Sequence, residues 1–293
     1  MQRDRLGYDV RKPEVLTLRL VPETGAAHGT VAGGSDNWIR STLPIPAASM
    51  MCCERHAAEG ELMPLDLHVI GKPNDIVTVP DSEILGYFQG AHYVDWYDQI
   101  ETDLNKVTIL DLAIPAFLDA VPNFKLLLHG RKTPLDESLR CLSAALVAVG
   151  PDQDLHEWVA THQPDEASAL LIDLFQASTG GRNESLPGFG PARCTKMLHL
   201  KRRKLIPIID SYARLAWIGV STAPWTTSEM AEIALQLGKW LAARPQQRQT
   251  LARIASEAGL PPLSTLRLYD IVQYEYFDSQ RRSHGGIPAE PLD

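Results

Sequence analysis

The sequence has 293 residues, of which 44% are hydrophobic and 22% are charged, the composition of a globular protein that can bury a full core. Its net charge of −8 argues against a protein that coats nucleic acid with its whole surface. No apolar run approaches the ~20 residues that span a bilayer, the charged N-terminus has no secretory-signal pattern, and the four cysteines include no CxxC pair. We therefore expect a cytoplasmic protein without a membrane partner.

The first 65 residues have the composition of a flexible or poorly ordered extension. They are rich in Gly, Ala, Ser and Pro and show no sustained periodicity. Met50, Met51 and Met63 leave open the alternative that translation starts later. Residues 284–293 have the composition of a frayed tail, so we expect the folded domain to span residues 66–283.

Helical signals dominate this domain. A β-branched run at 75–80 (DIVTVP) predicts one short strand, which would be unstable alone. At 107–121, Pro115 allows at most a kinked helix. Apolar residues at helical spacing predict helices at 81–91, 136–150, 154–162, 165–178, 228–243 and 263–277. The predicted fold class is mostly α, a compact helical domain.

Residues 186–198, LPGFGPARCTKML, have the features of a glycine turn that opens a helix. Gly188 and Gly190 can adopt positive φ and allow a close backbone approach, and Pro191 suits the first helical position. The amides of Ala192 and Arg193 would then point outward from the positive end of the helix, where a phosphate oxygen is favoured. A glycine turn that only packs two helices together is the alternative.

The same region is locally basic. From Pro191 to Arg214 the chain has seven Lys or Arg residues against one acid, a local charge of +6 in an acidic protein. This run predicts contact with a confined polyanion, with Arg193 and Lys196 adding charge-assisted hydrogen bonds. A solvated helix face is the alternative interpretation.

LPGFGPARCTKML resembles the helix-hairpin-helix signature of base-excision DNA glycosylases of the endonuclease III type, whose general form is LPGxGxxTAxxxL. In that superfamily the apolar stretch after the hairpin ends in an Asp that begins the next helix. Asp210, which follows Ile208 and Ile209, falls at this spacing. The resemblance covers about residues 165–217. The wider helical pattern, with KRRKLIPIIDS and STLRLYDIVQYE, is similar to an uncharacterised bacterial domain family that is usually described only as a domain of unknown function.

Departures from the signature limit the chemistry that the resemblance implies. Bifunctional members carry a Schiff-base lysine where this chain has Ala192, which argues against lyase chemistry there. Iron–sulfur members have four cysteines beyond the catalytic Asp, whereas no cysteine follows Cys194 here. The usual Thr-His after the Asp is Ser211-Tyr212. The resemblance therefore implies at most a monofunctional enzyme, with no cofactor and no iron–sulfur cluster.

Asp210 is the candidate catalytic residue. A carboxylate beside the sugar can stabilise the positive charge that develops when an N-glycosidic bond breaks, or it can activate a water molecule. An Asp followed by Ser is also a favoured helix N-cap, worth about 1 kcal/mol. The two roles are compatible, and the sequence does not choose between them.

We expect a DNA-associated protein whose hairpin holds backbone phosphates and whose Asp210 serves a monofunctional N-glycosylase. The residues expected to contact nucleic acid are Gly188, Phe189, Gly190, Ala192, Arg193, Lys196, Lys201 and Arg202. The alternatives are a non-catalytic DNA-binding module and an interaction protein whose hairpin only packs. No metal site is expected, because the histidines lack ligand spacing and the acidic run at 94–105 lacks the calcium-loop pattern; we expect that run to be a solvated face.

Overall fold

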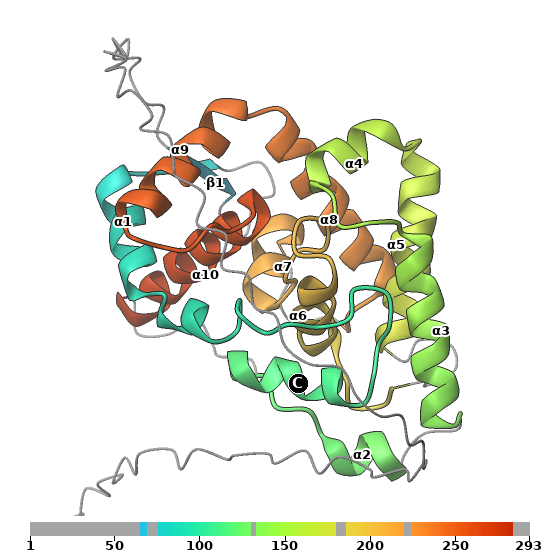
Figure 1. The fold of residues 1–293 in the computed structure, drawn as a ribbon. Helices are drawn as coiled ribbons and strands as arrows, with labels where there is room; N and C mark the ends of the chain where they lie inside the picture. The colour runs from blue at the N-terminus through green and yellow to red at the C-terminus, as the bar shows by residue number, and fades with distance from the viewer. Residues whose placement is uncertain (1–64, 69–75, 130–132, 180–185, 220–223, 284–293) are drawn as a thin grey trace, which may run out of the picture. The chain divides into compact units, whose positions relative to one another are not determined.

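A computed structural model of the chain describes residues 65–68, 76–129, 133–179, 186–219 and 224–283. Apart from Leu65, the predicted N-terminal extension and the predicted tail lie outside these ranges. Over the described ranges the fold is mostly α, as predicted, with ten α-helices, two 3-10 helices and one two-stranded sheet (Figure 1).

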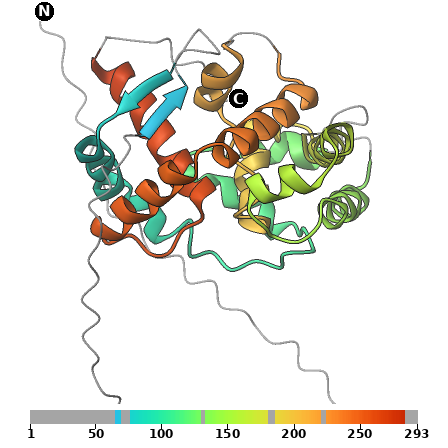
Figure 2. The same cartoon turned by 90° about the horizontal axis from the view of Figure 1, so that it is seen from above.

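The predicted strand forms and has a partner. It is β2 (Ile76–Val79), which pairs antiparallel with β1 (Leu65–His68), and the buried Leu65 lies opposite the buried Val79. Figure 2 shows the two strands side by side, and β1 packs against helix α9 (Pro245–Glu257). This helix supplies the apolar cover that an isolated two-stranded ribbon lacks.

One group of helices consists of α1 (Asp81–Gly90), α9 and α10 (Thr265–Ser283), which pack against one another. The periodic patterns at 81–91 and 263–277 predict α1 and α10. Helix α9 was not predicted, because two of its buried positions are polar, Gln247 and Thr250, and they interrupt the apolar stripe.

A second group consists of α3 (Leu135–Ala148), α4 (Leu155–Thr161), α5 (Pro164–Thr179) and α8 (Thr227–Ala242). Helix α8 packs against α4 and α5, and α3 packs against α5 (Figure 1). Gly238 permits the close approach of α8 to α4, because a Cβ there would lie 2.6 Å from Cγ2 of Val159. A capping box between Thr226 and Glu229 begins α8.

The remaining helices include those that build the site. They are η1 (His92–Asp95), η2 (Leu110–Leu118), α2 (Phe124–His129), α6 (Pro191–Lys201) and α7 (Ser211–Ile218). Helix α7 packs against both α8 and α10, and η2 packs against α6. The 107–121 segment, predicted as at most a kinked helix, is the 3-10 helix η2 with Pro115 inside it.

Within the ranges that the structure describes, none of the helices combines the length and the hydropathy required to cross a bilayer.

Candidate functional site: a charged pocket beside the hairpin

The glycine turn before α6 forms as the sequence predicts. Gly188 has a φ of 76°, a value that glycine adopts without strain, and the amide of Phe189 donates to the carbonyl of Leu186 at 3.1 Å. Gly190 is the N-cap of α6 and Pro191 is its first residue. Phe189 is buried, so its side chain anchors the turn in the core and is not available to a ligand.

The C-terminal end of α6 differs from the prediction. Lys201 is fully buried, and its ammonium group donates to Oδ1 of Asp111 at 2.7 Å and to two backbone carbonyls, those of Asp103 and Lys106, at 2.9 Å each. It also contacts the hydroxyl of Thr102. All of its donors are directed into the protein. The predicted contact of Lys201 with nucleic acid is therefore not possible in this conformation.

The side chain of Arg202 is also buried and hydrogen-bonded inside the protein. It is 1% exposed, and its Nε donates to the carbonyl of Gly150 at 2.6 Å while Nη2 donates to Oδ1 of Asn105 at 3.1 Å. The prediction that it contacts DNA is corrected for the same reason. Arg203 donates to the carbonyls of Asp98 and Ile100. These cations satisfy carbonyl groups of the 98–106 segment, which no helix or strand supplies with partners.

The acidic run at 94–105 is also not simply a solvated face. The carboxylate of Asp98 is buried and accepts from Arg267 on α10, with Nη2 to Oδ2 at 3.0 Å and Nε to both oxygens at 3.1 Å. Glu101 and Asp103 are exposed, as predicted. Asp98, a buried member of this run, is therefore held by α10.

Asp210 is the N-cap of α7. Its Oδ1 accepts from the amides of Tyr212 and Ala213, both at 3.0 Å, which fixes the orientation of the carboxylate. Thr195 on α6 ties down the preceding residue, because the amide of Ile209 donates to its hydroxyl at 2.9 Å. The predicted cap is thus observed, and α6 sets its position.

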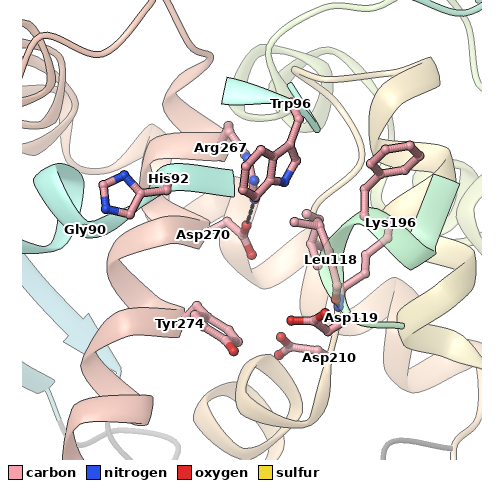
Figure 3. Close-up of a pocket in the computed structure, with 12 residues that line it drawn as sticks. Gly90, His92, Trp96, Leu118, Asp119, Lys196, Asp210, Arg267, Asp270 and Tyr274 are labelled. Carbon is pink, nitrogen blue, oxygen red and sulfur yellow. Dashed lines mark hydrogen bonds and ion pairs between the residues drawn. The ribbon is translucent and has the colours of Figure 1, made fainter. Parts of the chain in front are cut away.

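The same carboxylate also lines a pocket of about 280 Å³ (Figure 3). The pocket is lined by the end of α1, η1 and the residue after it, the end of η2, α6, the start of α7 and α10. Asp210 is 8% exposed, and its second oxygen, Oδ2, has no hydrogen-bond partner among the described residues. Capping therefore uses one oxygen of Asp210 and leaves the other for the pocket.

Lys196 lies in this pocket too, and not on the outer surface of the hairpin as predicted. Its Nζ donates to the carbonyl of Leu118 at 2.8 Å. Burial lowers the pKa of Lys196, while the carboxylates of Asp210, Asp270 and Asp119 oppose that shift. Lys196 is accordingly a buried amine close to three acids and without an ion pair to any of them within 4 Å.

Asp270 and Arg267 form the wall on α10. The guanidinium of Arg267 pairs with Asp270 as well as with Asp98. Burial raises the pKa of Asp270 to about 7, and Arg267 limits this shift while the nearby charge of Asp210 adds to it. Asp270 can therefore hold or release a proton near neutral pH.

Asp119 completes the charged lining at the end of η2. Its φ of 56° is a left-handed conformation, which Asp tolerates better than most residues. In Figure 3 the carboxylates of Asp119 and Asp210 and the hydroxyl of Tyr274 point toward one another. The rim carries two half-exposed aromatic side chains, Trp96 at 54% and Phe117 at 52%.

The structure thus brings two of the predicted site residues, Asp210 and Lys196, into one pocket. The turn residues Gly188, Gly190 and Ala192 stay partly exposed. Arg193 donates to the carbonyls of Val121 at 3.0 Å and Gly188 at 3.3 Å, which ties the turn to the segment after η2.

Sequence reasoning missed the residues on α10. Arg267, Asp270 and Tyr274 are spaced by three and four positions and so share one face of a helix. That face carries polar groups in a helix whose other buried residues are mostly apolar, and this was a usable signal. Asp119 and Trp96 had no comparable sequence signal.

The histidines were predicted to be surface or hydrogen-bonded residues. His199 is buried with Nδ1 2.8 Å from the carbonyl of Ile206, and burial lowers its pKa to about 3. The Nδ1 of His162 is 2.8 Å from the carbonyl of Trp158. His92 is exposed and lies at the edge of the pocket. Within the described ranges, no three His, Cys, Asp or Glu side chains are grouped to hold a metal ion.

Residues 81–276 match the model of DUF6308, a family of unknown function, and this match includes every element that lines the pocket. No curated protein and no solved structure matches the chain.

Proposed function

We propose that the pocket hydrolyses the N-glycosidic bond of a base extruded from DNA. The chain belongs to a family of unknown function, so this proposal is based on the residues of the site. The observation that carries this proposal is the carboxylate of Asp210. One of its oxygens is fixed by the helix cap, and the other has no hydrogen-bond partner among the described residues, on a side chain that lines the pocket.

This geometry suits a reaction in which positive charge develops on a sugar. As the bond between C1′ and the base nitrogen lengthens, the sugar becomes an oxocarbenium ion, and a fixed carboxylate lowers the energy of that state. Asp210 is already oriented by two amides, so little reorganisation is needed when the charge forms. It can also accept a proton from the attacking water.

A second group is required to protonate a neutral leaving base. Asp270 fits this role, because its pKa of about 7 lets it carry a proton at neutral pH and donate it. Both acids line the same pocket. In this proposal Asp210 stabilises the positive charge on the sugar, and Asp270 protonates the leaving base.

The lining also suits a flat heterocycle. Trp96, Phe117 and Tyr274 supply ring faces or edges at the mouth and wall, and aromatic side chains are the usual stacking partners of an extruded base. A volume of about 280 Å³ is at the small end for ligand pockets, as expected for one base with its sugar.

The contact with the DNA backbone is proposed for the turn at 188–192 alone. Gly188, Gly190 and Ala192 remain partly exposed at the start of α6, where amides and the helix dipole favour a phosphate. Since Lys201 and Arg202 are internal, we expect few phosphate contacts and a shallow salt dependence. Ala192 offers no amine, so the strand is expected to stay intact at the abasic product.

The test is release of the base from duplexes that each carry one modified base, assayed with the natural protein and with Asp210→Asn. An Asn side chain keeps a capping oxygen, so this variant is expected to fold and bind but to lose at least about 100-fold in rate, the order seen when one charge-stabilising group is removed. Circular dichroism and the melting temperature check the fold.

Two results would contradict the proposal. If the natural protein binds duplex DNA in a salt-sensitive way but releases no base from any substrate, the protein is a non-catalytic binding module. If Asp210→Asn releases bases as fast as the natural protein, the carboxylate is only a cap.

A further inference from the structure

We propose that Asp98, which does not line the pocket, is a positioning residue for the site: it fixes the guanidinium of Arg267 so that one nitrogen of that group meets Asp270. This inference rests on the proposed function, in which Asp270 protonates the leaving base. The juxtaposition that carries it is the buried pair of Asp98, shortly after η1, and Arg267 on α10, placed next to Asp270 on the same helix.

The first step is the geometry of Arg267. Its Nε and Nη2 donate to the carboxylate of Asp98 at 3.0 or 3.1 Å, while its Nη1 donates to Oδ2 of Asp270 (Figure 3). A guanidinium is planar and holds its donors in a fixed fork, so two nitrogens bound along one edge determine the direction of the third. Asp98 therefore sets the direction in which Nη1 points.

The second step is how the pair of Asp98 and Arg267 is itself held. Each side chain is 3% exposed, so water does not compete for their hydrogen bonds. The backbone carbonyl of Asp98 accepts from Arg203, which follows α6. The ring of Tyr97 lies 5.1 Å from the guanidinium carbon of Arg267, and its hydroxyl donates to the carbonyl of Lys196 on α6. The pair is thus fixed from two sides.

The third step is the charge that Asp270 meets. A carboxyl group beside an arginine ordinarily has a lowered pKa. Burial instead raises the pKa of Asp270 to about 7, and Arg267 only limits this rise. Because Asp98 neutralises the same guanidinium, the Asp98–Arg267 pair has no net charge. Asp270 therefore receives a hydrogen bond without a full opposite charge, which lets it hold a proton at neutral pH.

Other titratable and charged groups surround Asp270 and Arg267. Asp270 is faced by Asp210 at the start of α7, Lys196 on α6, Asp119 at the end of η2, His92 on η1 and Tyr274 on α10, while Tyr97 and His199 lie near Arg267 and Arg203 lies near both of them. Asp98 differs from these groups because it forms an ion pair with the cation that also pairs with Asp270.

The test follows the pKa of Asp270 by ¹³C NMR in the natural protein and in Asp98→Asn. Asn keeps an oxygen that can accept from Arg267 but removes the charge, so more of the arginine's charge acts on Asp270. We expect the pKa of Asp270 to fall by at least about one unit, the usual effect of a nearby opposite charge. Glu101→Gln is the matched control, because Glu101 is an exposed acid of the same segment, and it should leave this pKa unchanged.

The pH profile of base release is a readout that a merely structural role would not move. A fall of one unit in the pKa lowers the protonated fraction of Asp270 about tenfold at alkaline pH and little at acidic pH. We therefore expect Asp98→Asn to release base about tenfold more slowly than the natural protein at about pH 8 and at a similar rate at about pH 5.5. A protein that is only destabilised loses rate at both.

A measurement on the natural protein covers the case in which Asp98→Asn does not fold. If Asp98 holds the guanidinium, Nη1 and Nη2 of Arg267 give separate ¹⁵N signals both below and above the pH at which Asp270 titrates. If Asp270 holds it instead, protonation of Asp270 lets the guanidinium rotate, and the two signals merge at low pH.

Three results would overturn this inference: an unchanged or higher pKa of Asp270 in Asp98→Asn, an equal loss of rate at both pH values, or merged Nη signals of Arg267 at low pH. A lower pKa of Asp270 in Asp98→Asn, with no base released by either protein, supports the positioning by Asp98 and contradicts only the proposed hydrolysis.

Discussion

The two lysines of helix α6, one at its middle and one at its C-terminal end, are in opposite situations. Lys201 at the C-terminal end has a carboxylate, a hydroxyl and two carbonyls as partners. Lys196, little more than one turn earlier, has one carbonyl as its partner and faces acids that it does not reach. Buried groups that only support the fold are normally fully paired. The comparison therefore favours the part of α6 around Lys196, and not its more basic C-terminal end, for the proposed site.

The largest expected effect separates these two lysines. Lys201→Met leaves Asp111 buried without its cation, which should reduce the free energy of unfolding by about 3–5 kcal/mol. Lys196→Met removes an ammonium group that burial already disfavours, so the loss should stay below about 1 kcal/mol. Urea unfolding of both variants checks this. Equal losses would contradict the distinction between the two lysines.

A second effect concerns how stability changes with pH. Folded Asp270 keeps its proton up to a pKa of about 7, whereas the unfolded chain loses it near the ordinary value of 3.8. Because the folded state binds the proton more tightly, this group lowers stability as pH rises from about 4 to 7. The groups that face it are Arg267, Asp210, Lys196, Asp119, His92 and Tyr274.

Asp270→Asn should therefore lose less stability than the natural protein over that pH range. Melting temperatures at several pH values measure this difference, with Asp173→Asn as a control for an exposed acid. Parallel curves for the natural protein and Asp270→Asn would mean that folding does not raise the pKa of Asp270.

The smallest effect separates the two oxygens of Asp210. Asp210→Ala removes the cap and should cost about 1 kcal/mol of unfolding free energy, while Asp210→Asn keeps a capping oxygen and should cost only a few tenths. Thermal denaturation compares the two. If Asn destabilises the protein as much as Ala, the charge and not the cap determines the role of Asp210 in stability.

The sequence predicted the helices with regular apolar stripes and the turn at Gly188, because local periodicity and glycine content determine these features. It also predicted Asp210 as a cap or a catalytic group, and the structure places it as a cap in a pocket. The match at 81–276 agrees with the predicted similarity to an uncharacterised family.

The direction of the basic side chains could not be predicted from the sequence. Whether Lys201 faces water depends on the 98–111 segment, which lies some 90 residues away in the chain and folds over α6. A run of cations in a sequence is compatible with a solvated face and with a set of buried donors. The pocket was missed for a related reason: Asp119, Asp210 and Asp270 come from three distant segments that meet only in the fold.

The most direct test of the account is the titration of the Asp270 carboxyl group, followed by ¹³C NMR in the natural protein and in Asp210→Asn. The account predicts a pKa of about 7 in the natural protein and a lower value in the variant, because the charge of Asp210 contributes to the shift. Titration of Asp270 near 3.8 in both proteins would contradict the claim that the pocket raises the pKa of Asp270.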